Sequence, residues 1–206
     1  SGARLGHGKV VDHMFLDGLE DAYEPGRLMG TFAEDCAEKY QFTREAQDDY
    51  ALTSLENSLS AQKVGAFENE IRTVEVTDRK GAKSLVLFDE QPQNAQPDKI
   101  PYLKPAFRKN GTVTPANSSS ISDGAAALIL ASKSYSEKEG LPVRARILGH
   151  SSYAHAPGLF TTAPVYAVKN LLKSIDWSIE MVDLWEVNEA FAVVPMAFMQ
   201  ELDISR

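Results

Sequence analysis

The stretch from 111 to 131 constrains the fold more than any other part of this 206-residue chain. Residues 111–124 are rich in small hydroxyl side chains, and they run directly into the wholly apolar segment 125–131. An apolar run of this length predicts a strand that is buried on both faces of a sheet. A helix over 133–139 and a strand over 143–148 would then complete a β-α-β unit.

The same alternation continues toward the C-terminal end of the sequence. Pro164 suits the first turn of a helix whose apolar face extends to Ile175. Residues 183–187 predict a strand and 189–201 a helix, with Asn188 at their junction. Strands that alternate with helices imply a parallel or mixed sheet covered by helices on both faces. We therefore expect an α/β protein with a loop-rich α+β section in front.

Two helices are predicted in that front section. Apolar side chains recur with a helical period from Met29 to Tyr40. Thr43 can cap a second helix, and Gly65 is suited to end it. Cys36 lies within the apolar stripe of the first helix, and no neighbour in the sequence would lower the pKa of its thiol. We therefore interpret Cys36 as a buried structural thiol rather than a nucleophile.

An extended pair and a loop follow the second helix. Residues 71–76 and 85–88 are rich in β-branched and other apolar side chains, and they predict two strands joined by a turn at 79–81. The segment 89–105 contains Pro92, Pro97, Pro101 and Pro105. Because proline lacks a backbone donor, this segment predicts a loop laid over the surface.

Composition excludes several classes of function. The formal net charge of −8 argues against general nucleic-acid binding, which needs a basic face. No run approaches the roughly 18 apolar residues of a membrane span, so no membrane partner is expected. Cys36 is the only cysteine, which excludes an intrachain disulfide and a cysteine-rich zinc site. The four histidines do not pair at ligand spacing, so we expect no metal.

Two segments closely resemble signature stretches of the thiolase family, and of its acetoacetyl-CoA branch in particular. They are Gly111-Thr-Val-Thr-Pro-Ala-Asn-Ser-Ser-Ser-Ile-Ser-Asp-Gly-Ala-Ala-Ala127 and Trp185-Glu-Val-Asn-Glu-Ala-Phe-Ala192. Shorter matches occur in the family's order over essentially the whole chain. These are Asp17-Gly-Leu19, Met29-Gly-Thr-Phe-Ala-Glu34, Thr43-Arg-Glu-Ala-Gln-Asp48, Gly65-Ala-Phe-Glu-Asn-Glu-Ile71, Lys104-Pro-Ala-Phe107 and Thr161-Thr-Ala-Pro164.

The resemblance implies a thiolase-like fold, in which two similar α/β halves with mixed, helix-covered sheets carry an inserted loop domain that holds coenzyme A (CoA). Residues 1–120 resemble that loop domain, 121–141 the end of the first half and 142–206 the start of the second. The implied reaction condenses two acetyl-CoA molecules to acetoacetyl-CoA, or cleaves the product with CoA, through an acyl thioester on a cysteine. CoA and acyl-CoA are then substrates, and neither a metal nor a redox cofactor is needed.

The resemblance also assigns site residues. Asn188 matches the asparagine that holds a water in the oxyanion site, where a fixed donor stabilises developing negative charge. An equally simple interpretation makes Asn188 the N-cap of the helix over 189–201, and both can hold. Seven further residues match positions beside CoA or the acyl group, and plain core packing is the alternative for the apolar ones. They are Leu19, Met29, Phe107, Pro115, Ser119, Ala190 and Phe191.

The catalytic groups of the family are missing from the match. Its nucleophilic cysteine, its Gly-His-Pro histidine and its Cys-x-Gly-Gly-Gly cysteine have no counterpart here. We therefore expect the 206 residues to be the middle half of a thiolase, a fragment that is inactive alone; the opening Ser1 in place of Met agrees. Residues 1–13 resemble the loop that pairs dimers into tetramers, which implies a homotetramer of the full-length protein. With no targeting segment, the cytoplasm is the expected compartment.

Two other functions remain open at this point. One is a degradative 3-ketoacyl-CoA thiolase that prefers longer acyl chains. The other is a non-catalytic module that binds CoA or serves assembly. Activity ratios on short and long 3-ketoacyl-CoA would separate the first from the acetoacetyl-CoA branch, and a stable chain that binds CoA without chemistry would indicate the second.

Overall fold

The computed structural model describes residues 5–206, in which helices dominate and a single hairpin supplies the strands. The α-helices are α1 (Met29–Tyr40), α2 (Arg44–Lys63), α3 (Glu90–Asn94), α4 (Lys133–Glu139), α5 (Ala163–Ser174) and α6 (Val193–Leu202). The strands are β1 (Val74–Thr77) and β2 (Lys83–Val86). A π-helical turn spans Phe15–Leu19, and 3-10 turns span Pro97–Tyr102, Pro157–Thr162 and Ile179–Met181.

The predicted helices of the front section are confirmed. The Thr43 side chain accepts a hydrogen bond from the backbone N–H of Ala46 at 3.1 Å, so it caps α2 as expected. Gly65, just after the helix, has a φ of +67°, which a residue with a side chain would adopt only with strain. Cys36 is buried on α1, as predicted.

The predicted hairpin is confirmed, and the loop predicted after it is confirmed only in part. β1 and β2 pair antiparallel, with Val74 opposite Val86, and the turn lies where Arg79-Lys80-Gly81 predicted it. The segment 89–105 is not wholly irregular, because it contains α3 and a 3-10 turn. Asp89 starts α3 by accepting a hydrogen bond from the N–H of Gln91, and Pro97 opens the 3-10 turn.

The three strands predicted in the second half are wrong as strands. Segments 125–131, 143–148 and 183–187 run extended, but within residues 5–206 their backbones form no ladder with one another or with any other segment. A β-strand is defined by its hydrogen bonds to a neighbouring strand. These segments have the apolar side chains of a buried strand, but no neighbouring strand to bond to in the described part of the chain. The helix between the first two, α4, forms as predicted, and Gly140 ends it at a φ of +62°.

The last helix begins later than the sequence suggested. α6 starts at Val193, and its N-cap position is Ala192, so the interpretation of Asn188 as a helix cap is wrong. The reason is competition for the backbone. The N–H of Ala192 donates to the carbonyl of Asn117 at 2.9 Å, and the carbonyl of Ala190 accepts from the N–H of Ser119 at 3.0 Å. The backbone of residues 190–192 is therefore hydrogen-bonded to residues 117–119, so the helix starts only after them.

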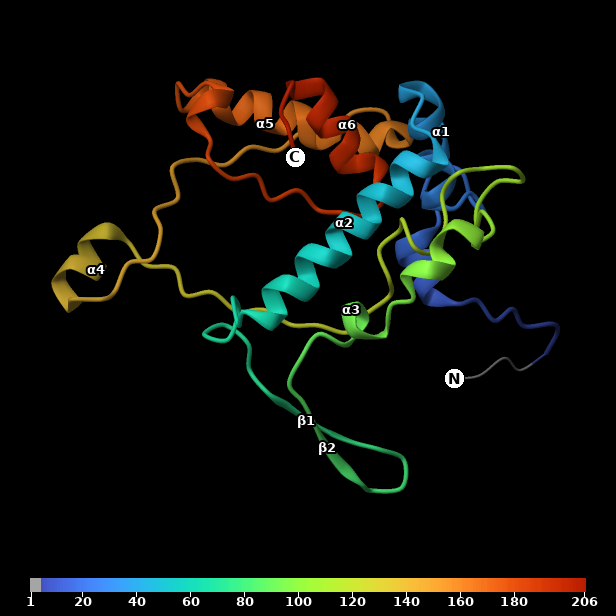
Figure 1. Ribbon diagram of the computed structural model, residues 1–206, viewed down its shortest axis with the longest axis horizontal. Coiled ribbons are helices and arrows are strands. Elements are labelled where there is room, and N and C mark those ends of the chain that lie inside the picture. Colours follow the sequence, from blue (N-terminus) through green and yellow to red (C-terminus); the bar gives the residue numbers. More distant parts are fainter. Residues whose placement is uncertain (1–4) are drawn as a thin grey trace.

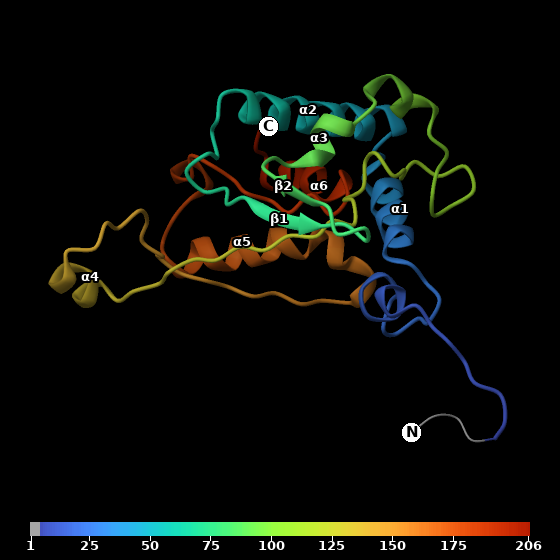
Figure 2. The same ribbon diagram turned by 90° about the horizontal axis from the view of Figure 1, so that it is seen from below.

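The core lies where α1, α5 and α6 meet the 3-10 turn over Pro157–Thr162 (Figure 1). One cluster joins α1 to the start of α6 and includes Ala33, Cys36, Val194 and Ala197. A second lies between α5 and α6, around Val165, Phe198 and Leu202. Figure 2 shows α2 on one side of α6 and α5 on the other. The hairpin and the arm that carries α4 extend away from this body.

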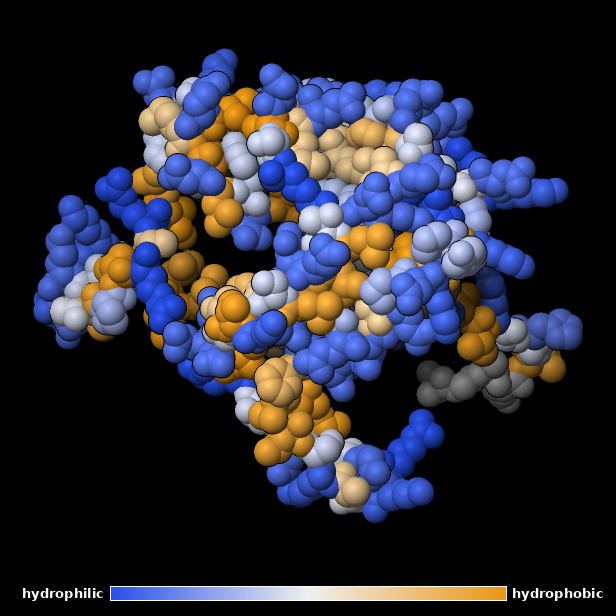
Figure 3. Space-filling view, viewed as in Figure 1, coloured by the Kyte–Doolittle hydropathy of each residue, from blue (hydrophilic) through white to orange (hydrophobic). Residues whose placement is uncertain are grey.

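Large apolar side chains remain exposed on the extended segments. Leu128 and Ile129 are 90% and 96% exposed, and Val143 and Ile147 are mostly exposed as well. Hydrophobic colour gathers on the arm beside α4 and at the base of the hairpin in Figure 3. No helix among residues 5–206 combines the length and apolar character that crossing a bilayer requires.

Candidate functional site

The two signature segments lie against each other. Ser118 and Phe191 form an antiparallel bridge, with a backbone hydrogen bond on each side of it at Ser119 and Ala192. The hydroxyl of Ser119 also donates to the carbonyl of Glu189 at 2.6 Å. Residues separated by some seventy positions in the sequence are thereby brought together, and Ser119, Ala190 and Phe191 meet as neighbours.

Most of the apolar candidates gather in one cluster beside this bridge. Met29, Phe107 and Ala190 pack against the core that contains Phe191. The rings of Phe107 and Phe191 meet edge to face, with centroids 6.0 Å apart. A Cβ on Gly30 would overlap the Phe107 ring, which explains a glycine directly after Met29. Core packing and a lining role remain compatible for these side chains, since all but Phe191 are only partly buried.

Leu19 and Pro115 lie at the margins of the cluster. Leu19 ends the π-helical turn. The next residue, Glu20, forms an isolated antiparallel bridge with Leu28, so Leu19 and Met29 lie on either side of that bridge. Pro115 is exposed in the turn between Thr114 and Ser118. The hydroxyl of Ser118 donates to the carbonyl of Thr114 at 2.7 Å, which closes that turn.

Buried polar side chains fix the hydroxyl-rich loop from below. The Glu34 carboxylate on α1 is 3% exposed, and it accepts hydrogen bonds from the N–H groups of Thr112 and Val113 at 2.9 Å. Gln47 on α2 donates to the Thr112 hydroxyl at 2.9 Å. The hydrogen bonds that this carboxylate accepts offset the free-energy cost of burying its charge. They also hold the start of the loop in place.

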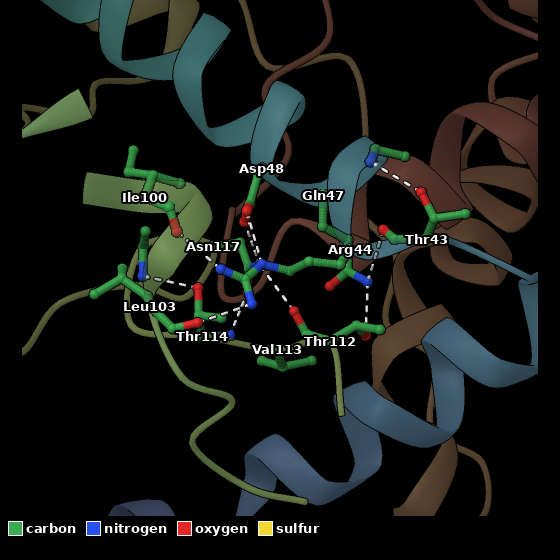
Figure 4. Close-up of polar contacts among 12 residues, drawn as sticks. Thr43, Arg44, Gln47, Asp48, Ile100, Leu103, Thr112, Val113, Thr114 and Asn117 are labelled. Carbon is green, nitrogen blue, oxygen red and sulfur yellow. Dashed lines mark hydrogen bonds and ion pairs between the residues drawn. The ribbon is translucent and has the colours of Figure 1, made fainter. Parts of the chain in front are cut away.

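Asp48 carries the same network to the end of the loop (Figure 4). Its two carboxylate oxygens accept from Arg44 at 2.7 Å and from the Asn117 side-chain amide at 3.0 Å. Arg44 also donates to the carbonyls of Ile100 and Leu103. The Asn117 side-chain oxygen accepts from the N–H of Thr114 at 2.8 Å, while its backbone carbonyl holds Ala192. Asn117 thus connects α2, the loop and the segment before α6.

The side chain of Glu189 attaches the second segment to α2. Tyr50 and Ser54, one turn apart on α2, donate their hydroxyl hydrogens to the two carboxylate oxygens of Glu189, each at 2.7 Å. Burial and this hydrogen bond raise the pKa of the Tyr50 phenol above its ordinary value. The phenol therefore remains a donor throughout the neutral range.

Asn188 itself faces an open groove. The groove has a volume of about 750 Å³ and is lined by Tyr50, Ser119, Trp185, Asn188 and Glu189, among others. Asn188 is exposed, whereas the next residue is tied to α2 and to Ser119. An exposed amide on an anchored segment can present a hydrogen-bond donor to a ligand or a water at a fixed place.

The single cysteine belongs to the buried cluster that contains Phe191 and does not line the groove, and it is unsuited to nucleophilic chemistry. Cys36 is 5% exposed on α1, and burial raises the pKa of its thiol. A thiol becomes a nucleophile as its thiolate, which this environment disfavours. In the part of the chain that the structure describes, no group of three or more His, Cys, Asp or Glu side chains is placed to hold a metal ion.

The residues that position the site were not singled out from the sequence. They are Glu34, Asp48, Tyr50, Ser54, Asn117 and Glu189. Two signals were available. Glu34 and Asp48 are acidic residues close to the apolar faces of their helices, and Tyr50 and Ser54 stand at helical spacing. Their partners lie 69 to 139 positions away, which no local pattern reveals.

Comparison with known proteins decides the family. The model described as "Thiolase, N-terminal domain" matches residues 1–134, and "Thiolase, C-terminal domain" matches residues 141–206. The chain belongs to the thiolase family. A "Probable acetyl-CoA acetyltransferase" of Dictyostelium discoideum is 47% identical over 98% of this chain and 49% of its own length.

Solved structures confirm the partial thiolase-like fold. The acetyl-CoA acetyltransferase of Bacillus anthracis superposes with a TM-score of 0.92 at 38% identity, over 100% of this chain and 52% of its own. The Acat5 thiolase of Ascaris suum in complex with coenzyme A gives a TM-score of 0.90 at 38% identity, over the same shares of both chains. The chain thus spans about half the length of the relatives it matches.

The superposition also includes the unpaired segments. All of this chain, including 125–131 and 143–148, has a counterpart in these thiolases, while about half of each thiolase has none here. The predicted division at 120 and 141 and the roles assigned to the eight site residues are not tested by these comparisons and stay predictions.

Proposed function

We propose that this chain supplies the CoA-holding part and one oxyanion-site residue of an acetyl-CoA acetyltransferase. The observation that carries the proposal is the direct pairing of 117–119 with 189–192, in which Ala190 and Phe191 meet the hydroxyl-rich loop beside a groove lined by Ser119 and Asn188. The relatives named acetyl-CoA acetyltransferase support the short-chain branch over a degradative thiolase for longer chains. CoA and acyl-CoA are the proposed ligands, as in the CoA-bound Ascaris suum thiolase.

The proposed chemistry follows from the functional groups. The Asn188 amide would hold a water where the thioester carbonyl develops negative charge, and a fixed donor at that place stabilises the transition state. The hydroxyl of Ser119 and the apolar faces of Phe107, Met29 and Phe191 offer a polar contact and packing surface for the CoA arm and the acyl group.

The nucleophile has to come from residues outside these 206. The chemistry needs a thiolate that attacks the acyl carbonyl, and Cys36 is buried in the thiol form, away from the groove. The chain alone would therefore hold substrate without turning it over. A role in lipid metabolism is proposed from the reaction alone, since it joins the two-carbon acetyl groups of acetyl-CoA.

Assembly and compartment belong to the same proposal. A homotetramer is inferred from the likeness of residues 1–13 to the family's tetramer loop, of which residues 1–4 lie outside the described part of the chain. The cytoplasm is proposed because a mouse relative, 40% identical over 100% of this chain and 52% of its own length, is named as cytosolic.

Two measurements on the chain test the proposal. A preparation is first verified by mass spectrometry at 22.6 kDa. Isothermal titration with CoA should then show saturable binding, and Ser119→Ala should weaken it, while Ser132→Ala at the N-cap of α4 should not. Thiolysis of acetoacetyl-CoA, followed by loss of its absorbance, should stay at background. No CoA binding, or turnover by the verified chain, would each contradict the proposal.

A further inference from the structure

Glu189 is the neighbour of Asn188 that ties it to α2 by hydrogen bonds. On the preceding side, residues 183–188 make no backbone hydrogen bond within residues 5–206. On the following side, the Glu189 carbonyl accepts from Ser119 at 2.6 Å, and the Ala190 carbonyl accepts from the Ser119 N–H. The preceding side is held by packing, because Trp185 and Val187 lie against the cluster around Phe198. The placement of Asn188 relative to α2 and Ser119 therefore depends on Glu189, which makes the hydrogen bonds to both.

The side chain of Glu189 adds a second attachment. Both of its oxygens are occupied, one by the Tyr50 hydroxyl and one by the Ser54 hydroxyl, at 2.7 Å. Hydrogen bonds from neutral donors to a carboxylate are about twice as strong as those between neutral groups. Because the two donors stand one turn apart on the same helix, the carboxylate is fixed in direction as well as in distance.

α2 is also the element that fixes the facing loop. Asp48, on the first turns of α2, holds the Asn117 amide, and Gln47 holds Thr112. The segment that carries Asn188 and the hydroxyl-rich loop are thus both attached to α2. The segment is bound at Tyr50 and Ser54, and the loop is bound at Asp48. Their relative placement is set by a helix and not by two independent loops.

We propose that Glu189 is a positioning residue, which fixes Asn188 relative to α2 and Ser119 so that the carbonyl site and the CoA-holding loop keep a constant separation. The proposal rests on the proposed function for the meaning of Asn188, although the tether itself can be measured without it. Removal of the Glu189 carboxylate should loosen the stretch around Asn188 against α2, while Trp185 and Val187 stay packed on the cluster around Phe198.

The test measures a distance across the groove in the 206-residue chain. Nitroxide labels are placed at Asn188→Cys on the segment and Asn57→Cys on the exposed side of α2, in a Cys36→Ala background, and pulsed electron resonance records the distance distribution. Both label sites are exposed and outside the hydrogen bonds described above. Glu189→Ala should broaden the distribution at least about twofold, the signature of a segment released to local motion.

Variants around Glu189 separate positioning from general stability. Glu189→Gln keeps an acceptor oxygen and should restore most of the narrow distribution. Tyr50→Phe with Ser54→Ala should broaden it as Glu189→Ala does, without any change in the segment. Asp183→Ala, which removes another exposed acid of the same segment, is the matched control and should leave it narrow.

The outcomes distinguish the tether from the proposed function. An unchanged width in both Glu189→Ala and the α2 double variant would overturn the proposal, as would equal broadening in Asp183→Ala. The proposal would also be overturned if every variant, Asp183→Ala included, broadened the distribution and lowered the urea midpoint by a similar amount, because the effect would then be a global loss of stability. CoA titration of the unlabelled chain is scored separately, so absence of CoA binding would contradict the proposed function and leave the tether result standing.

Discussion

At the scale of single residues, Asp48 is the most consequential polar side chain. Its side chain is 8% exposed, and it is shared between the Arg44 guanidinium and the Asn117 amide. Asp48→Ala would leave a largely buried cation and a buried amide donor without their partner. Breaking such a pair costs about 3–5 kcal/mol, which is a large part of a domain's stability.

Urea unfolding followed by Trp fluorescence should therefore show a much lower midpoint for Asp48→Ala. Glu75→Ala is the control, because it removes the exposed ion pair with Lys83 on the hairpin. Such a pair contributes about 0–1 kcal/mol. A Glu75→Ala loss as large as that of Asp48→Ala would contradict the assignment of Asp48 as the centre of the network.

The buried hydroxyl and thiol groups make stability depend on alkaline pH. Burial raises the pKa of the Cys36 thiol and of the Tyr40 and Tyr50 phenols, and carboxylate partners raise those of the two tyrosines further. As pH rises, the unfolded chain therefore loses these protons first. Their stabilising contribution is complete below about pH 8.5, the ordinary range of a thiol, and is lost progressively above it.

The free energy of unfolding in urea should consequently fall above about pH 8.5, where the unfolded thiol ionises, and fall further above about pH 10, where the unfolded phenols ionise. Tyr40→Phe with Tyr50→Phe should flatten the part of this fall above about pH 10, although the variant loses the hydrogen bonds to Glu201 and Glu189 at every pH. A stability that is constant or rises over this range would show that these groups are not protected in the folded chain.

At the scale of elements, α2 depends on its N-terminal cap. Thr43 accepts the N–H of Ala46, and its loss leaves an orphan donor at the start of a helix on which both site segments depend. Thr43→Ala should lower the free energy of unfolding by about 1 kcal/mol. Thr53→Ala is the matched control, because its hydroxyl only donates back to the Asp49 carbonyl within the helix.

Thermal unfolding followed by circular dichroism would compare these two variants. Thr53→Ala should be neutral or slightly stabilising, since alanine has the higher helix propensity. Equal losses in both variants would mean that the cap contributes nothing specific to α2.

Local elements could be predicted from the sequence where their causes are local. The stripe from Met29 to Tyr40, the Thr43 cap and the stop at Gly140 each involve residues within a turn or two, and α1, α2 and α4 formed as expected. Segment 125–131 failed as a strand because a strand requires a partner, which hydrophobic pattern alone does not supply.

The candidate site was likewise predicted only in part. The resemblance selected Ser119, Asn188, Ala190 and Phe191, and the structure places these residues around one groove or bridge. It assigned no role to Asp48, although Asp48 ends one of the matching stretches, and it did not include Tyr50. The importance of both comes from partners far along the chain. The later start of α6 could not be predicted either, because Ala192 is already bonded to Asn117.

At the scale of the whole molecule, the unpaired extended segments dominate behaviour in solution. Residues 121–131 have no backbone hydrogen bond within the described chain, and Leu128, Ile129 and Leu130 are 90%, 96% and 74% exposed. Free N–H and C=O groups beside exposed apolar side chains form a template for pairing with another strand. We expect this chain to self-associate through this segment when no other polypeptide covers it.

Sedimentation velocity should show association that increases from about 5 to about 100 µM, the range in which exposed strand edges aggregate. Ile129→Lys should shift the chain toward the monomer, because a charged side chain opposes edge-to-edge pairing. Tyr102→Lys is the control, since Tyr102 is 85% exposed but lies in a 3-10 turn. If both variants associate as the wild-type chain does, then another surface is responsible, and the hairpin, with Val74 and Leu85 also exposed, becomes the segment to substitute.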